Sequence, residues 1–423
     1  MKNAISILES RGLLDNVTSP DIREKVESPL TVYAGFDPTS DSLQVGNLVT
    51  IMMLAHFQRC GHKVIAVVGG ATAQIGDPSG KSVERKLMSV AEINHNADGI
   101  RENLSRFLDF HHHDAPAIIV NNLDWIGGFS FIEFLRDVGK HFRMGPMLGK
   151  ESVRARLDSD AGMSFCEFSY QLLQAYDFMH LYSEYDCTVQ IGGSDQWGNI
   201  TAGIDLVHKL RDGQTYGVTS PLVTDASGAK LGKSEGNAVY LSADKTPVYQ
   251  FYQYFVRTDD ADVIKLLKIF TFLEDDEIGE IEKAMAEAPE KREAQKRLAA
   301  ELTQLVHGEE GLSIALKATD VLFGGSLEGC SADDLMTIFA DVPSADLERG
   351  EVESGNVVDV VQAAGLGKSK GEVRRLIQNG GLYVNNQRIE DPAATISPDD
   401  LVDNQVLILR SGKKKYHLVR VSG

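Results

Sequence analysis

The stretch TVYAGFDPTSDSLQVGNLVTIMMLAHFQRCGHKVIAVVGG, residues 31–70, contains the pattern of a strand, a loop, a helix and a second strand. The apolar runs at 31–36 and 63–70 are typical of buried strands, and apolar side chains recur through 46–61 as in a helix. Later runs, AIIV and TVQIGG, repeat this alternation with helical patterns between them. We therefore expect an α/β fold with a Rossmann-like, doubly wound parallel sheet, whose ligands bind beyond the carboxyl ends of the strands.

The pattern changes after residue 246. Residues 247–330 are rich in helix formers and predict an α-helical domain. Residues 331–353 predict a linker, and residues 354–423 predict a small α+β domain. The catalytic domain is then expected within residues 1–246, where the loops that follow the strands carry the informative motifs.

Composition restricts the class of protein. The chain has 423 residues, of which 43% are hydrophobic and 24% charged, as in soluble globular proteins of two to three domains. It lacks both an apolar run of ~20 residues and the pattern of a signal peptide. Its four cysteines are scattered, which favours a reducing cytoplasm and argues against disulfides or a structural metal. We expect a cytoplasmic protein without membrane contact or protein-bound metal.

The charge is unevenly distributed. The net charge of −19 argues against nucleic-acid binding by the body of the chain. Residues 351–423, however, have 10 Lys and Arg against 9 Asp and Glu, a net charge of +1, and the remainder has 32 against 52, a net charge of −20. A polyanion is therefore expected to bind at the C-terminal segment.

The glycine-rich loop GGATAQIGDPSGKS, residues 69–82, nearly matches a phosphate-binding P-loop. Ile75 stands where that motif needs its first glycine, and Pro78 has no N–H group to offer a phosphate. The P-loop kinases and ATPases are therefore excluded, and on its own the loop is an ordinary turn after a strand.

Two other loops favour phosphate binding when they are taken together. QVGN, residues 44–47, opens a helix whose free N–H groups favour a triphosphate, and Gly46 allows close approach to the backbone. KLGKS, residues 230–234, lies about 185 residues later and offers two mobile ammonium groups to a pyrophosphate. Either motif alone would be an unremarkable loop.

A third constellation lies on a helix. Tyr170, Gln174 and Asp177 are spaced i, i+4 and i+7, which places them on one helix face. They could form a polar surface stripe, but the flanking residues are apolar on most sides, so the helix is expected to be buried and its polar face to line a cavity. The next strand ends in QIGGSDQWGN, residues 190–199, with further polar side chains.

The chain resembles the class I aminoacyl-tRNA synthetases in four segments, GFDPT, DSLQVGN, IGGSDQWGN and KLGKS. Among these enzymes, the helix constellation resembles that of the tyrosyl-tRNA synthetases. The first signature is usually His-x-Gly-His, and here Gln44 and Asn47 replace both histidines. The resemblance implies activation of L-tyrosine with ATP and Mg²⁺ to tyrosyl-adenylate and pyrophosphate, followed by transfer of tyrosine to the 3′ end of tRNA(Tyr). It also implies a homodimer formed through an insertion at about 124–165.

The resemblance implies a role for individual residues. The tyrosine phenol would be bound by Tyr33 and Asp177, and the α-ammonium group by Asp77, Tyr170 and Gln174, with support from Gln190 and Gln196. The catalytic contacts to the ATP phosphates would come from Lys230, Lys233, Thr39, Gln44 and Asn47. The other ATP contacts would come from Asp37, Gly46, Asp195, Lys81 and Arg85.

The last segment, 357–421, resembles an S4-type RNA-binding domain. Its basic residues Lys370, Arg374 and Arg375 lie on or beside one predicted helix and would contact tRNA. Two alternatives stay open. One is a tryptophanyl-type synthetase, although these typically lack such a tail. The other is a synthetase-derived RNA-binding protein that has lost catalysis, which the sequence QVGN makes conceivable.

Overall fold

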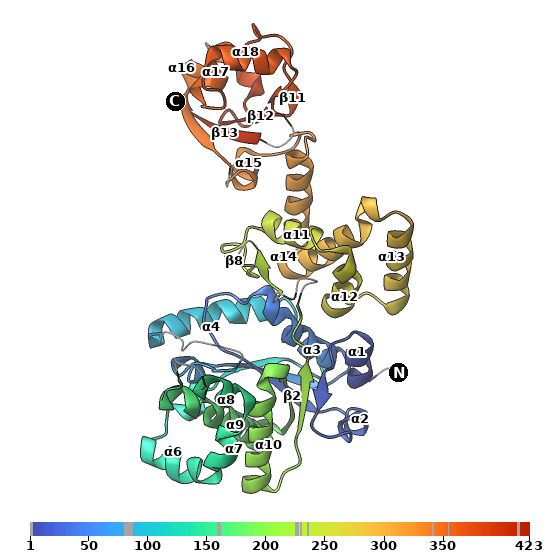
Figure 1. The fold of residues 1–423 in the computed structure, drawn as a ribbon, viewed down its shortest axis with the longest axis vertical. Coiled ribbons are helices and arrows are strands. Elements are labelled where there is room, and N and C mark those ends of the chain that lie inside the picture. Colours follow the sequence, from blue (N-terminus) through green and yellow to red (C-terminus); the bar gives the residue numbers. More distant parts are fainter. Residues whose placement is uncertain are drawn as a thin grey trace. The chain divides into compact units, whose positions relative to one another are not determined.

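The computed structural model describes residues 3–79, 88–158, 162–224, 228, 231–234, 237–340, 342–353, 355–412 and 415–423. The chain forms two compact units, Met1–Val306 and His307–Gly423. Figure 1 shows their elements coloured along the sequence. None of the helices in the described ranges is long and apolar enough to span a membrane.

The first unit is built on a sheet with the strand order β1-β6-β5-β2-β3-β4. Its parallel strands are β2 (Thr31–Phe36), β3 (Lys63–Val68), β4 (Ile118–Asn121), β5 (Cys187–Gly193) and β6 (Tyr216–Ser220), and β1 (Asn16–Val17) joins antiparallel at the edge. From β2 the chain winds outward through β3 and β4 and then returns to the other side of β2 with β5. The predicted doubly wound parallel sheet is confirmed, and its switch point lies between β2 and β5.

Helices cover this sheet and connect its strands. The helices of this part are α1 (Ala4–Ser10), α2 (Ile22–Lys25), α3 (Leu48–Arg59), α4 (Val90–Leu104), α5 (Leu123–Ile126), α6 (Phe131–Asp137), α7 (Met144–Leu148), α8 (Glu151–Leu157), α9 (Phe165–Tyr185) and α10 (Trp197–Arg211). α3 is buried along nearly its whole length because apolar residues occupy most of its positions. α9 and α10 pack side by side (Figure 1). Gly203 of α10 allows Phe178 of α9 to approach closely.

The chain then leaves the sheet and becomes helical. A hairpin of β7 (Lys233–Ser234) and β8 (Asn237–Ala238) precedes α11 (Val248–Val256), α12 (Asp260–Phe270), α13 (Asp275–Glu287) and α14 (Glu293–Leu322). This confirms the predicted helical part of the fold. α14 is interrupted at Gly308, whose φ of 74° and ψ of −177° are not helical.

The second unit has its own sheet, with the order β11-β10-β12-β13-β9. Its strands are β9 (Ser344–Glu348), β10 (Leu382–Val384), β11 (Gln387–Arg388), β12 (Val406–Ser411) and β13 (Lys415–Ser422), and its helices are α15 (Ala332–Ile338), α16 (Arg349–Glu353), α17 (Val357–Ala363) and α18 (Lys370–Gln378). The predicted small α+β unit is confirmed. The stretch 331–353, for which a linker is expected, contains α15, β9 and α16, and β9 pairs in parallel with β13.

A buried ion pair fixes the start of α9. Arg156 of α8 donates two hydrogen bonds, of 2.5 and 2.8 Å, to the carboxylate of Glu167 in the first turn of α9. The two side chains are only 4% and 3% exposed. Arg156 also donates to the carbonyl of Gly162, so one guanidinium ties together three neighbouring segments.

We expect Arg156→Ala to lower the free energy of unfolding by about 3–5 kcal/mol, because it leaves the Glu167 carboxylate buried without its partner. The measurement is urea unfolding at matched protein concentration. Arg136→Ala is the control, since it breaks a pair with Asp137 whose side chains are 64% and 46% exposed, and it should cost about 0–1 kcal/mol. Equal losses for the two variants would contradict the assignment.

Candidate active site

A cavity of about 410 Å³ opens at the carboxyl ends of β2 and β5, the switch point of the sheet. Most side chains that the sequence singled out line it together. These are Tyr33, Asp37, Thr39, Gln44, Gly46, Asn47, Asp77, Tyr170, Gln174, Asp177, Gln190, Asp195 and Gln196. They come from strands, loops and helices that extend from residue 33 to residue 196 of the chain, and the parallel sheet brings them to one edge.

Other predicted residues lie elsewhere. Lys81, Arg85 and Lys230 fall outside the described residues, and of Lys233 only the backbone, in β7, is described. Lys370, Arg374 and Arg375 are exposed on α18 of the second unit, where Lys370 pairs with Asp359 at 2.8 Å.

One part of the cavity holds a buried carboxylate. Asp177 is 4% exposed and accepts hydrogen bonds from Asn122 Nδ2 at 3.0 Å and Trp125 Nε1 at 2.8 Å. Burial raises the pKa of this carboxyl to about 7, although the two hydrogen bonds act in the opposite direction. Close by, the Tyr33 hydroxyl is buried and has no hydrogen-bond partner among the described residues. This arrangement offers an acceptor and a donor to a polar group of a ligand.

Asn122 and Trp125 are functional candidates that the sequence analysis missed. Asn122 directly follows β4, and the carboxyl end of that strand was a signal that could have identified it. Trp125 has no such signal. Its indole stacks on His180 of α9, with ring centroids 4.4 Å apart and an interplanar angle of 15°, and this stacking supports its orientation toward Asp177.

A second polar cluster lies where α9, α10 and the loop after β3 meet. Gln196 Nε2 donates to Asp77 at 2.8 Å, and Asn199 Nδ2 lies 3.1 Å from the side-chain oxygens of both Gln174 and Gln196. Asn199 is 6% exposed and was also missed, although it ends the quoted segment IGGSDQWGN. The cluster holds an acidic group among amide oxygens, an environment suited to a cationic ligand group.

Tyr170 extends this cluster toward β2. Its hydroxyl donates to Asp37 Oδ2 at 2.9 Å, and Thr72 donates to the other oxygen of the same carboxylate at 2.7 Å. Gln190 Oε1 is buried and has no partner among the described residues. In the part of the chain that the structure describes, no group of three or more His, Cys, Asp or Glu is placed to hold a metal ion.

The QVGN segment forms a short 3₁₀ turn, Val45–Asn47, at the start of α3. Asn47 Oδ1 accepts the backbone N–H of Gln44 at 2.9 Å and so closes the turn. The oxygen of Asn47 is therefore used within the turn, and its amide nitrogen is the group left to donate to a ligand.

Comparison with known proteins assigns the family. The family model of class I tRNA synthetases (W and Y) matches residues 24–324, and that of the tyrosine–tRNA ligase SYY-like C-terminal domain matches residues 334–419. The chain belongs to the class I tRNA synthetases of the tryptophan and tyrosine group. The resemblance to tyrosyl-tRNA synthetases found in the sequence is thereby confirmed.

Individual relatives agree with this assignment. The synthetase is 52% identical over 422 residues to the tyrosine–tRNA ligase of Protochlamydia amoebophila, with 100% of this chain and 99% of the relative covered. It is 49% identical to that of Rhodopirellula baltica, with 99% and 96% covered. A C-terminally truncated mitochondrial tyrosyl-tRNA synthetase of Aspergillus nidulans superimposes with a TM-score of 0.67 at 32% identity, covering 74% of this chain and 92% of the other.

We expect the Asp177 carboxyl to titrate near pH 7. The chain has two tryptophans, so Trp197→Phe leaves Trp125 as the only indole. Below pH 7 the carboxyl is neutral and accepts the indole N–H weakly, and above pH 7 it is charged and accepts it strongly. Trp125 fluorescence should therefore change with a midpoint at about pH 7.

The control is Asp177→Asn in the same background, which should abolish this transition. Burial lowers the pKa of His180, so any change in fluorescence caused by that ring occurs at lower pH and survives the substitution. A flat signal between about pH 6 and 8 before the substitution would show that Asp177 does not titrate there.

Proposed function

We infer that the chain activates L-tyrosine with ATP and transfers the tyrosyl group to the 3′ end of tRNA(Tyr), the reaction of a tyrosine–tRNA ligase. The observation that carries this function is the buried Asp177 carboxylate beside the Tyr33 hydroxyl, which has no hydrogen-bond partner among the described residues, in the cavity of a class I synthetase. Full-length relatives that carry the name tyrosine–tRNA ligase support it.

In the proposed site the tyrosine phenol donates to Asp177 and accepts from Tyr33. Phenylalanine would leave the buried Tyr33 hydroxyl without an acceptor and would offer no proton to Asp177, a form of rejection for which tyrosyl-tRNA synthetases are the standard example. The α-ammonium group is then bound by Asp77, Tyr170 and Gln174, with Gln190 and Gln196 in support. The Tyr170 hydroxyl donates a hydrogen bond to Asp37, so its oxygen can accept one from the ammonium group.

The first chemical step requires no protein nucleophile. The tyrosine carboxylate attacks the α-phosphorus of ATP, the bond to the bridging oxygen breaks, and pyrophosphate leaves with its electron pair. The protein contributes positioning and stabilisation of charge.

For the ATP contacts we propose two groups of residues. The phosphates would be bound by Lys230, Lys233, Thr39, Gln44 and Asn47, with Lys81 and Arg85 as secondary contacts. Asp37 and Asp195 would orient the ribose, and Gly46 allows the nucleotide to approach. Mg²⁺ would accompany ATP on its phosphate oxygens, and the carboxylates that line the cavity are the donor type that this ion accepts.

We assign tRNA binding to the second unit. Lys370, Arg374 and Arg375 are all exposed on α18, and the residues after 350 carry a net charge of +1 whereas the rest of the chain carries −20. Contacts from such residues to phosphates make binding weaken steeply with salt. The proposed division is a cytoplasmic enzyme with catalysis in 1–246, an anticodon-side helical domain in 247–330, and RNA binding in 354–423.

The experiment that tests the function is ATP–pyrophosphate exchange with each of the twenty amino acids. Exchange that depends on tyrosine alone is expected. Exchange with tryptophan instead would favour the tryptophanyl alternative. Tight RNA binding without exchange for any amino acid would favour an RNA-binding protein that has lost catalysis.

We expect Gln44→Ala and Asn47→Ala each to slow tyrosine-dependent exchange by about tenfold, the effect of losing one hydrogen bond to a charged phosphate. Tyrosine affinity, measured by equilibrium dialysis, should not change, because neither side chain belongs to the tyrosine clusters. Gln362→Ala, which removes an exposed amide on α17, is the control. If both variants exchange at the rate of the unmodified enzyme, the motif does not contact ATP.

Exposed apolar side chains support the homodimer. Phe131 and Ile132 of α6 are 66% and 68% exposed, Met144 of α7 is 59% exposed, and Phe165 at the start of α9 is 67% exposed. All lie within or at the end of the segment 124–165, for which the dimer contact is expected. Large apolar side chains gathered in one segment and left in water are typical of a protein interface.

We expect the double substitution Phe131→Ser and Ile132→Ser to shift the protein from dimer to monomer at micromolar concentration, because it removes apolar area from the contact. Sedimentation velocity measures the change. Val90→Ser alters a residue of α4 that is 48% exposed and should leave the dimer intact. A dimer that survives the double substitution would place the interface elsewhere.

A further inference from the structure

The loops that carry the two ATP motifs are joined by backbone hydrogen bonds. Leu241 N–H donates to the Leu43 carbonyl at 2.8 Å, and Val45 N–H donates to the Val239 carbonyl at 2.9 Å, so 43–45 and 239–241 form a short antiparallel ladder. The ladder continues into KLGKS, because Val239 N–H also donates to the Gly232 carbonyl at 2.8 Å. QVGN and the described part of KLGKS therefore share one framework.

The contact between the two motifs is close. Gly232 has a φ of 94°, and a Cβ atom at this position would lie 3.1 Å from the backbone nitrogen of Gly46. Its own N–H donates to the Tyr254 hydroxyl of α11 at 2.8 Å. Glycine adopts this conformation more readily than other residues. Gly232 therefore allows the backbone of KLGKS to contact the backbone of QVGN directly.

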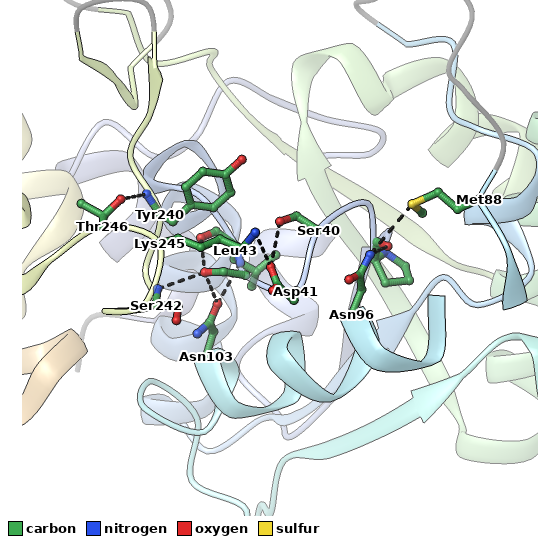
Figure 2. A network of polar contacts seen from close by, with 12 residues as sticks. Ser40, Asp41, Leu43, Met88, Asn96, Asn103, Tyr240, Ser242, Lys245 and Thr246 are labelled. Atoms are coloured by element: carbon green, nitrogen blue, oxygen red, sulfur yellow. Dashed lines mark hydrogen bonds and ion pairs between the residues drawn. The ribbon is translucent and has the colours of Figure 1, made fainter. Parts of the chain in front are cut away.

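The buried side-chain amide of Asn103, on α4, accepts a hydrogen bond from Leu43 at one end of this ladder (Figure 2). Asn103 is 9% exposed, and its Oδ1 accepts Leu43 N–H at 2.8 Å and the Ser42 hydroxyl at 3.1 Å. The Ser42 oxygen in turn accepts Ser242 N–H at 3.0 Å. One side-chain oxygen thus orders both strands of the ladder, and Asn103 itself does not line the cavity.

Lys245 stabilises the other end of the ladder through an ion pair and a contact with an aromatic ring. Lys245 Nζ lies 2.7 Å from Asp41 Oδ1 and 5.2 Å from the centre of the Tyr240 ring. α4 packs tightly against the same loop, since a Cβ atom at Gly99 would clash with the Asp41 carbonyl. The loop that carries QVGN therefore packs against α4 at Gly99 and is hydrogen-bonded to it at Asn103.

We propose that Asn103 is a positioning residue for ATP activation, which acts by fixing the ladder that sets QVGN against KLGKS. The proposal rests on the ATP contacts proposed for these two motifs. Groups on opposite sides of one triphosphate must be placed together for the reaction, and small errors of placement reduce the rate strongly. The tyrosine clusters on α9 and β5 make no described hydrogen bond to Asn103.

The test compares Asn103→Ala with Asn103→Asp. Alanine removes the acceptor of Leu43 N–H and leaves the Ser42 hydroxyl with only the Leu43 carbonyl as its acceptor, at 3.0 Å, and kcat/KM for ATP in tyrosine-dependent exchange should fall about tenfold. Aspartate keeps an oxygen that accepts both bonds and should retain activity within about twofold. The Kd for tyrosine, measured by equilibrium dialysis, should be the same for both variants and the unmodified enzyme.

Asn96→Ala is the matched control. Asn96 lies on the same helix but donates to the Pro38 carbonyl, upstream of the ladder, at 3.0 Å, so its loss should leave kcat/KM for ATP within about twofold. A second variant, Lys245→Met, breaks the ion pair with Asp41, whose side chains are 35% and 39% exposed. It should lower kcat/KM for ATP about two- to fivefold, again without changing tyrosine affinity.

Three results would overturn the proposal. They are unchanged kcat/KM for ATP in a folded Asn103→Ala variant, an equal loss of tyrosine affinity, and a loss in Asn103→Asp as large as that in Asn103→Ala. Should Asn103→Ala not fold, unchanged ATP kinetics in Lys245→Met would decide against it. Failure of the proposed function is distinct, because the unmodified enzyme would then show no tyrosine-dependent exchange.

Discussion

The parallel pairing of β2 with β5 is the constraint on which the site depends. These strands lie next to each other although about 150 residues separate them, and the connections on either side run away from the crevice between them. Tyr33 and Gln190 are register partners in this pairing. Both side chains consequently reach the same cavity, and every loop that follows a neighbouring strand adds its polar groups there.

The cavity holds groups that cost stability. A buried carboxylate such as Asp177 is desolvated, and the hydrogen bonds from Asn122 and Trp125 offset only part of that cost, as its raised pKa indicates. The buried Tyr33 hydroxyl, for which the described part of the chain offers no hydrogen-bond partner, adds a cost of about 1–3 kcal/mol. In the proposed function the tyrosine phenol donates to Asp177 and accepts from Tyr33, so one ligand group offsets part of both costs.

The sequence predicted what local spacing determines. The i, i+4, i+7 spacing placed Tyr170, Gln174 and Asp177 on one face of α9, and strand patterns located the loops that line the cavity. It missed Asn122, Trp125 and Asn103, whose hydrogen-bond partners lie 50 or more residues away in the chain. It also missed Asn199, which joins Gln174 of α9 to Gln196. The sequence also did not predict β9, because SADLE has a weak apolar pattern and forms a strand by pairing with β13.

The replacement of both histidines by Gln44 and Asn47 gives the ladder its importance. In the proposed ATP site, these neutral amides donate hydrogen bonds but carry no positive charge, so each would stabilise a phosphate less than an imidazolium would. Asn47 also uses its oxygen to close its own turn. Weaker donors contribute to catalysis when they are held in place before the charge develops. In our proposal, the backbone framework that joins these amides to KLGKS, and that Asn103 of α4 stabilises, supplies that placement.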